Sequence, residues 1–218
     1  MTSKKDIGFN KNYWDAFYAD KHLHVPSQFC VSVATELDKD TVIIELGSGN
    51  GRDALYYASR GHLVVATDLS QQAIASCSEA AKDRGLEHTA FLEGDITNDD
   101  SVTSIIELAR SKAEGNNIAF YSRFIMHSLD DIQELKFLTI LSKLMAKGEQ
   151  VFFEFRSKED ADLEKIHKGH FRRYVDTEQF IRRLDDLGLS TSYRITGKGM
   201  AKYKTEDPFV SRVIAVKL

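Results

Sequence analysis

The chain has 218 residues, of which 42% are hydrophobic and 28% charged, with a formal net charge of −4 and a pI near 6.0. This length suits one α/β domain, and the acidic balance argues against a protein that mainly binds nucleic acid. The sequence shows no signal-peptide pattern, no apolar run of membrane-spanning length, and no metal-ligand or disulfide spacing at Cys30 and Cys77. We therefore expect a reduced cytoplasmic protein without a metal site or a membrane contact.

Apolar runs alternate along the chain with segments of helical periodicity. The predicted strands are 41–46, 63–67, 89–92, 118–121, 150–155, 193–195 and 210–216. The predicted helices are 10–22, 27–37, 52–60, 70–85, 98–112, 130–147 and 177–187. This alternation predicts a doubly wound, mainly parallel sheet with right-handed crossovers, and the lack of a helical pattern between 196 and 210 fits a final hairpin.

Two helices carry more specific expectations. The helix 10–22 places Tyr13, Trp14, Phe17 and Tyr18 at helical spacing. Because about forty residues precede the first strand, 1–40 is predicted to form a helical cap on a single domain. Residues 41–156 would then form the core of the domain, and 157–218 a polar segment and the closing strands. In the helix 130–147 the apolar spacing predicts that four residues face inward: Ile132, Leu135, Leu138 and Leu141.

A glycine-rich loop follows the first predicted strand and opens the next helix. Gly47, Gly49 and Gly51 alternate there, and Glu45 lies two residues before the first of them. Glycine is needed where a loop adopts positive φ or lets backbone approach a ligand closely. Such a strand, loop and helix bind nucleotide-like ligands at the edge of a Rossmann-like sheet.

The spacing around this loop indicates which nucleotide-like ligand is bound. A dinucleotide fingerprint has G-x-G-x-x-G, but Arg52 occupies the position of its third glycine, and a pyrophosphate would not favour the carboxylate of Glu45. Glu45 suits a ligand with an ammonium group. Asp68, at the end of the next strand, is placed to accept hydrogen bonds from two ribose hydroxyls. This pattern resembles motifs I and II of class I SAM-dependent methyltransferases over roughly residues 40–155.

The resemblance implies a seven-stranded Rossmann-like sheet with an antiparallel last strand and S-adenosyl-L-methionine (SAM) as cofactor. In this family the acid after strand three meets the adenine amino group, which assigns that role to Asp95 with Ile96 beside it. The full set of predicted cofactor-binding residues is Glu45, Gly47, Ser48, Gly49, Asn50, Gly51, Asp68, Leu69, Asp95, Ile96 and Tyr121.

The segment after strand four lies at the methyl-transfer position of class I enzymes. It reads Tyr-Ser-Arg-Phe-Ile-Met-His and lacks the Asn/Asp-Pro-Pro-aromatic motif of enzymes that methylate planar nitrogens. His127 or His170 is a candidate general base for a neutral hydroxyl. Arginines at the ends of strands four and five and in 170–174 form a candidate anion receptor. These residues are Arg123, Arg156, Arg172 and Arg173, although Arg172 and Arg173 could instead pair with Asp176 or Glu178.

A looser resemblance concerns the acceptor. The segments Tyr-Trp-Asp-x-Phe-Tyr, Pro-Ser-Gln-Phe, Ser-Arg-Phe-Ile-Met-His, Glu-Phe-Arg and His-Phe-Arg-Arg-Tyr are similar to small bacterial methyltransferases of capsule and surface-polysaccharide synthesis. This similarity implies O-methylation of a sugar or a phosphate-bearing precursor. The alternatives are an RNA or protein methyltransferase and a non-catalytic SAM-binding protein. The sequence leaves the oligomeric state open.

Overall fold

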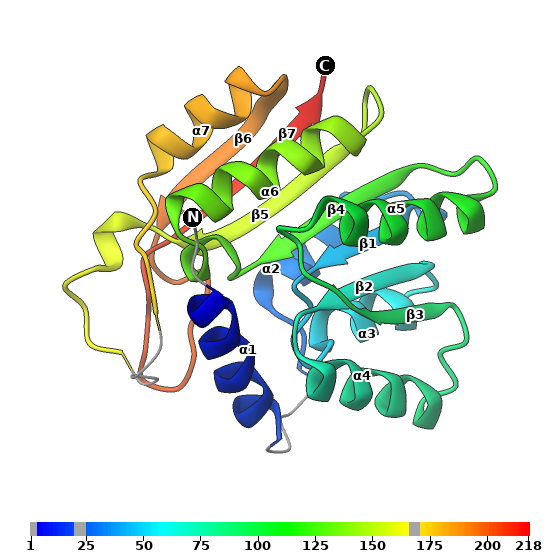
Figure 1. Ribbon diagram of the computed structural model, residues 1–218. Helices are drawn as coiled ribbons and strands as arrows, with labels where there is room; N and C mark the ends of the chain where they lie inside the picture. Colours follow the sequence, from blue (N-terminus) through cyan, green and yellow to red (C-terminus); the bar gives the residue numbers. More distant parts are fainter. Residues whose placement is uncertain (1–3, 20–24, 166–170) are drawn as a thin grey trace.

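One sheet of seven strands forms the centre of the molecule, in the order β3-β2-β1-β4-β5-β7-β6 (Figure 1). The computed structural model describes residues 4–19, 25–165 and 171–218, and the side chains of its first helix from residue 11 onward. The strands are β1 (Val42–Leu46), β2 (Val64–Asp68), β3 (Thr89–Glu93), β4 (Ile118–Arg123), β5 (Gln150–Arg156), β6 (Leu189–Gly197) and β7 (Val210–Lys217). Strands β1 to β5 pair in parallel, whereas β7 is antiparallel to both β5 and β6. The predicted fold class is therefore confirmed.

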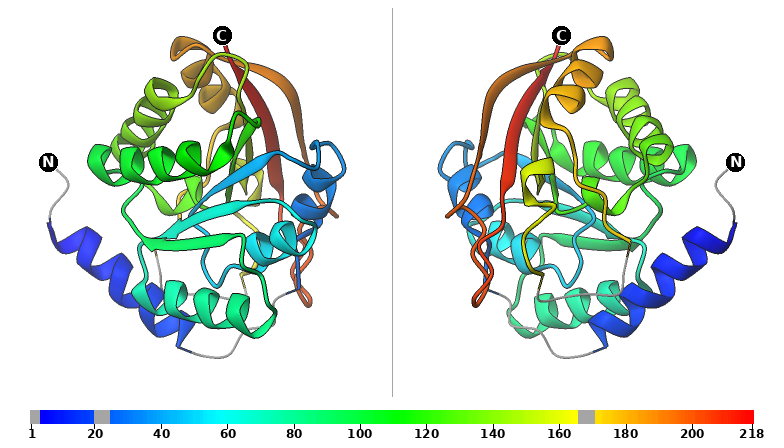
Figure 2. Two further views of the ribbon diagram at one scale, coloured as in Figure 1. Left: turned by 90° about the vertical axis from the view of Figure 1, so that its right-hand side faces the viewer. Right: turned by 90° about the vertical axis from the view of Figure 1, so that its left-hand side faces the viewer.

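Helices cover both faces of this sheet (Figures 1 and 2). The α-helices are α1 (Lys4–Tyr18), α2 (Gln28–Ala34), α3 (Arg52–Ser59), α4 (Gln71–Asp83), α5 (Asp99–Ala113), α6 (Asp131–Leu144) and α7 (Thr177–Asp186). Two short 3₁₀ turns, η1 (Met126–Ser128) and η2 (Lys158–Asp160), follow β4 and β5. Side chains of α5, α6 and α7 build one hydrophobic core, and those of α2 and α3 build the other.

Strand β1 shows why the sheet needs two helical layers. Val42, Ile44 and Leu46 pack into the core on the side of α5 and α6, whereas Ile43 packs on the side of α2 and α3. Successive side chains of a strand point to opposite faces, so an unbroken apolar run is stable only where both faces are buried. The carboxyl end of β1 is thereby held rigidly at the edge where the glycine loop begins.

The inward face of α6 differs from the predicted one. Leu138 and Leu141 are buried as expected, but Ile132 is 63% exposed and Leu135 is 47% exposed. The buried face instead includes Glu134, which Arg173 and Arg183 neutralise. An ion-paired glutamate at a buried position hides the true period of this helix from an analysis of apolar spacing.

Helix α1 lies outside these two layers and runs alongside α4 (Figure 2). Lys11 Nζ donates to the backbone oxygen of Leu69 (2.8 Å), and Ser70 Oγ donates to Asp15 Oδ1 (2.5 Å). These contacts place the aromatic face of α1 beside the carboxyl ends of β1 and β2. Among the described helices, none is long and apolar enough to cross a membrane.

Candidate cofactor and acceptor site

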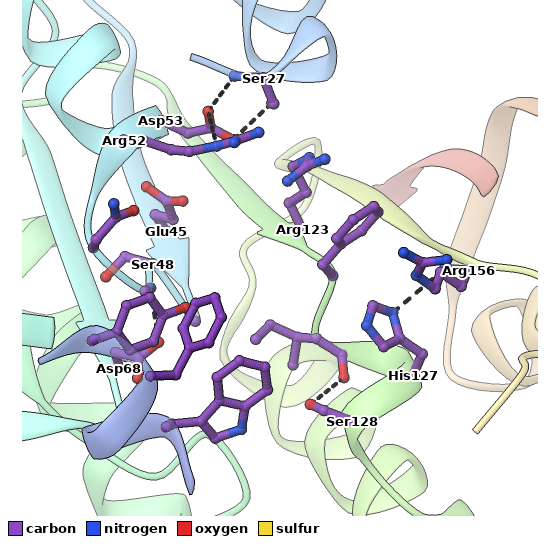
Figure 3. Close-up of a pocket in the computed structure, with 18 of the residues that line it drawn as sticks. Ser27, Glu45, Ser48, Arg52, Asp53, Asp68, Arg123, His127, Ser128 and Arg156 are labelled. Carbon is purple, nitrogen blue, oxygen red and sulfur yellow. Dashed lines mark hydrogen bonds and ion pairs between the residues drawn. The ribbon is translucent and has the colours of Figure 1, made fainter. Parts of the chain in front are cut away.

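A cavity of about 900 Å³ opens at the carboxyl edge of the parallel strands. Its walls come from the loops after β1 to β4, from Arg156 at the end of β5, from α1, from residues 25–28, from Arg172 and from the β6–β7 connection. Figure 3 shows Glu45, Ser48 and Asp68 on one wall and Arg123, His127 and Arg156 on the opposite wall. The first wall is here called the cofactor half and the second the acceptor half.

The glycine loop forms the floor of the cofactor half. Gly47, Gly49 and Gly51 have φ values of +84°, +54° and +71°, which L side chains rarely adopt. A Cβ on Gly47 would collide with Ile125, and one on Gly49 would lie 2.3 Å from the Tyr18 hydroxyl. Gly51 has a different role, because it packs beneath Cys77 and is absent from the described cavity wall.

Two polar atoms in this half lack a hydrogen-bond partner in the described structure. They are Glu45 Oε2 and Ser48 Oγ, and both residues are buried. Burial raises the pKa of Glu45 well above its usual value, and the nearby Asp53 carboxylate adds to this effect. A buried carboxylate of this kind is stabilised by a cationic ligand group, so the site fits the ammonium group of SAM.

Asp68 ends β2 and connects the glycine loop with the start of α4. Its Oδ2 accepts a hydrogen bond from the backbone N–H of Gly49 (2.8 Å), and its Oδ1 accepts one from Ser70 (2.9 Å). Each carboxylate oxygen has a second lone pair, so Asp68 can also accept bonds from ribose hydroxyls. Burial raises the pKa of Asp68 despite these two backbone donors.

The remaining predicted cofactor residues divide between the cavity and the core. Asn50, Leu69, Asp95 and Ile96 line the cofactor half, and Asp95 Oδ1 accepts hydrogen bonds from the backbone N–H and the hydroxyl of Thr97. Tyr121 does not line the described cavity. It is 1% exposed, stacks on Phe29, and donates its hydroxyl hydrogen bond to Asp53 Oδ2 (2.8 Å). Tyr121 therefore supports the site from the core.

Asp53, which accepts the hydrogen bond from Tyr121, was not among the residues predicted from the sequence. Asp53, in the first turn of α3, lines the cavity and accepts hydrogen bonds from the backbone N–H of Ser27 (2.7 Å) and from its hydroxyl (2.8 Å). Ser27 is also the N-cap of α2, so Asp53 attaches the start of α2 to the glycine loop. The position of Asp53 just after the glycine loop was a signal in the sequence, but its partner Ser27 lies 26 residues earlier in the chain.

The predicted arginines of the acceptor half are paired with buried acids. Arg123 Nε donates to Glu154 Oε1 (2.6 Å), and Arg156 forms ion pairs with Asp160 (2.7 Å) and with Glu206. Both arginines line the cavity, as does Arg172. Arg173 is absent from the described wall, because it pairs with Asp131 and with the buried Glu134 of α6. Arg173 is thus paired, but with Asp131 and Glu134 and not with Asp176 or Glu178, the partners that the sequence offered as an alternative.

His127 lies in η1 at the back of the acceptor half. It is 5% exposed and lines the cavity, and the backbone N–H of Arg156 approaches its Nδ1 at 3.5 Å (Figure 3). Its backbone oxygen accepts a hydrogen bond from Arg173 (2.8 Å), which fixes the chain after residue 170 against η1. The other candidate base, His170, lies outside the described residues.

The β6–β7 connection supplies cavity residues that the sequence did not indicate. Lys202, Tyr203, Lys204 and Glu206 line the acceptor half. Two tethers hold this connection to the sheet: Arg156 pairs with Glu206, and Arg212 Nη2 donates to the backbone oxygen of Met200 (2.8 Å). The alternating lysines gave no signal, because their approach to the site depends on the final hairpin.

Comparisons with known proteins agree with this geometry. Residues 43–104 match a family described as a methyltransferase domain, a stretch that runs from β1 into α5. No curated protein matches the chain. A SAM-dependent methyltransferase from Anabaena variabilis is similar in structure, with 14% identity, a TM-score of 0.74, and coverage of 97% of this chain and 95% of that one.

Two further solved structures have named activities. Magnesium protoporphyrin IX methyltransferase from Synechocystis, with bound SAH, has 15% identity, a TM-score of 0.69, and coverage of 98% of this chain and 100% of that one. A glycopeptide N-methyltransferase complexed with SAM has 14% identity, a TM-score of 0.65, and coverage of 89% and 95%. At these identities the likeness establishes the fold. Together with the family match over the cofactor half, it supports a SAM-dependent methyltransferase with SAM as cofactor.

Proposed function

We propose that the chain transfers the methyl group of SAM to an oxygen of a small anionic acceptor. The observation that carries this proposal is the charge of the acceptor half. Glu206 is the only acid in the described wall of this half, and Arg156 neutralises it. The basic residues of the same wall are Arg123, Arg156, Arg172, Lys202 and Lys204.

The ion pairs of the arginines indicate which cations can attract an anionic acceptor. Asp160 and Glu206 both pair with Arg156, so Arg156 contributes less attraction than the sequence suggested, whereas Glu154 is shared between Arg123 and Arg212. Lys202 and Lys204, two exposed residues of the cavity wall, add to the attraction for an anion, and Arg172 lines the same wall. Exposed cations of this kind draw a charged ligand toward a cleft.

Different residues would bind the cofactor, align the acceptor and remove a proton. Glu45, the glycine loop and Asp68 would hold the cofactor, which supplies an electrophilic methyl group on a sulfonium centre. The protein then aligns the acceptor oxygen with that methyl group and excludes water, so positioning is its main contribution. An oxygen that is already ionised needs no base, whereas a neutral hydroxyl would need His127 or His170. A phosphate-bearing carbohydrate precursor meets these requirements, and we place the reaction in surface-polysaccharide synthesis.

The test is a transfer assay with methyl-labelled SAM. The acceptor panel contains nucleotide-sugars, sugar phosphates, the same sugars without phosphate, RNA and protein, and Asp68→Ala serves as the cofactor-site control. We expect labelled product from a phosphorylated acceptor. Arg172→Ala should raise the KM for that acceptor about tenfold or more, whereas Arg173→Ala, altered at a paired neighbour outside the cavity, should not. Labelling confined to uncharged sugars, RNA or protein would contradict the proposal.

A further inference from the structure

Phe124 combines a bulky side chain with an unusual backbone conformation at the cavity. Within the described residues, three residues other than glycine have positive φ: Glu114, Phe124 and Lys204. Glu114 is exposed at the end of α5, and Lys204 is exposed in the β6–β7 connection, where it also lines the cavity. Phe124 has φ +61° directly after β4 and lines the cavity. A bulky side chain in the left-handed region is strained and persists only where its surroundings hold it.

Several contacts hold Phe124 in place. Its backbone N–H donates to the backbone oxygen of Glu154 at 2.7 Å. The guanidinium carbon of Arg123 lies 3.9 Å from the centroid of the ring, and that of Arg156 lies 5.7 Å from it. The His127 ring packs edge-on at 5.2 Å between centroids. The strained backbone thus keeps an aromatic face against the Arg123 guanidinium, which it attracts through a cation–π interaction.

These contacts hold the Arg123 guanidinium in one orientation. Among the described residues its only side-chain hydrogen bond runs from Nε to Glu154, so the two terminal nitrogens have no protein partner there, and Arg123 lines the cavity. Glu154 also accepts a bond from Arg212 Nε (2.8 Å), so one carboxylate serves two guanidinium groups. This triad, with Glu154 buried between two partly buried arginines, carries a surplus positive charge, and Figure 3 shows Arg123 on the acceptor wall, facing the wall that carries Glu45.

We infer that Arg123 is a bidentate receptor for a carboxylate or phosphate group and that Phe124 is the positioning residue that aims it. The planar guanidinium matches two oxygens of such a group, and its pre-ordered geometry lowers the entropy lost on binding. Two sources of this anion can reach the centre of the cavity: the carboxylate of the cofactor's amino-acid part, or the anionic group of the acceptor. The second source rests on the proposed function, whereas the first does not.

Calorimetry with three probes tests this inference. The probes are S-adenosylhomocysteine, methylthioadenosine (which lacks the amino-acid carboxylate), and inorganic phosphate added to the S-adenosylhomocysteine complex. The variants are Arg123→Lys, Phe124→Leu and Phe124→Tyr. Lysine keeps the charge but loses the fork, leucine removes the aromatic face, and tyrosine retains it.

We expect Arg123→Lys and Phe124→Leu to weaken one anionic probe about tenfold or more and to leave methylthioadenosine binding within about twofold, with Phe124→Tyr close to wild type. Weaker S-adenosylhomocysteine binding would show that Arg123 binds the carboxylate of the cofactor. Weaker phosphate binding would show that it binds the anionic group of the acceptor. If phosphate does not bind the wild-type complex while S-adenosylhomocysteine responds, the proposed acceptor fails and the receptor stands. Unchanged binding of both anionic probes, equal weakening of all three probes, or failure of tyrosine to rescue overturns the inference.

Discussion

Asp68 shows how one side chain can order both the protein and a ligand. Its carboxylate accepts backbone hydrogen bonds from Gly49 and Ser70, and it lines the cavity where the ribose of SAM would lie. Asp68→Ala should weaken SAM binding by about 2–4 kcal/mol, at ~1–2 kcal/mol for each lost hydrogen bond to the charged group.

Calorimetry on the folded variant measures this change. Asp68→Asn is the matched control, because its side-chain oxygen can still accept one of the bonds and its size is unchanged. Unchanged affinity in the alanine variant, with an intact thermal transition, would remove Asp68 from the cofactor site.

The raised pKa of Glu45 predicts that cofactor binding depends on pH. Its pKa is raised by burial in the ligand-free protein, whereas a bound ammonium group would favour the ionised form and lower that pKa. SAM binding should therefore release protons from Glu45, and affinity should rise as the pH increases toward and through the raised pKa. Calorimetry in buffers of different ionisation enthalpy measures the released protons. Glu45→Gln should lower that number, and an equal release in both proteins would exclude Glu45 as the titrating group.

At the scale of elements, α1 brings the aromatic side chains of the N-terminal segment to the cavity. Trp14 stacks near Tyr18 with ring centroids 5.9 Å apart, and both residues line the cavity together with Tyr13 and Phe17. Burial raises the pKa of the Tyr18 hydroxyl well above its usual value, so this hydroxyl stays protonated next to the glycine loop.

This arrangement makes Trp14, the single tryptophan of the chain, a reporter of cofactor binding. If α1 acts as the predicted cap, S-adenosylhomocysteine should shift the emission of Trp14 and protect the N-terminal segment from proteolysis, because closure excludes water from the aromatic cluster. Trp14→Phe serves as the spectroscopic blank. If S-adenosylhomocysteine changes neither the emission spectrum nor the cleavage pattern, α1 is a fixed packing element.

At the scale of the whole molecule, surface ion pairs connect segments that are distant in sequence. Arg183 and Arg173 hold the pKa of Asp131 below its usual value, and Lys158 does the same for Asp176. A carboxylate with a lowered folded-state pKa adds stability above its unfolded pKa of about 3.9 and loses that contribution as the pH falls through the folded value.

Acid denaturation should therefore begin as the pH falls below about 4, through protonation of these two carboxylates among others. Asp131→Asn and Asp176→Asn should each flatten the acid limb of the unfolding free energy, measured by urea titration from pH 7 downward. Asparagine is also a good N-cap, so Asp176→Asn keeps the start of α7 and isolates the charge. An acid limb with the wild-type slope would show that the two pairs contribute little, as exposed pairs often do.

The sequence by itself determined the fold class and the outline of the cofactor half. β1, its glycine loop and α3 follow one another directly, and their conformations depend on local preferences: β-branched residues for the strand and positive φ for the glycines. Asp68 and Asp95 follow the next two strands, and parallel strands bring their carboxyl ends to one edge without further information.

The acceptor half was decided by the tertiary structure. Arg123 meets Glu154 across 31 residues, Arg173 meets Glu134 across 39, and Arg156 meets Glu206 across 50. Each pairing requires the finished sheet, because no local pattern states which acid neutralises which arginine. The same dependence explains why no sequence pattern indicated Lys202 and Lys204, which reach the cavity through the final hairpin. It also explains why Tyr121, inside β4, faces the core and not the cavity: the face that a strand residue takes is set by register and packing, which only the folded chain specifies.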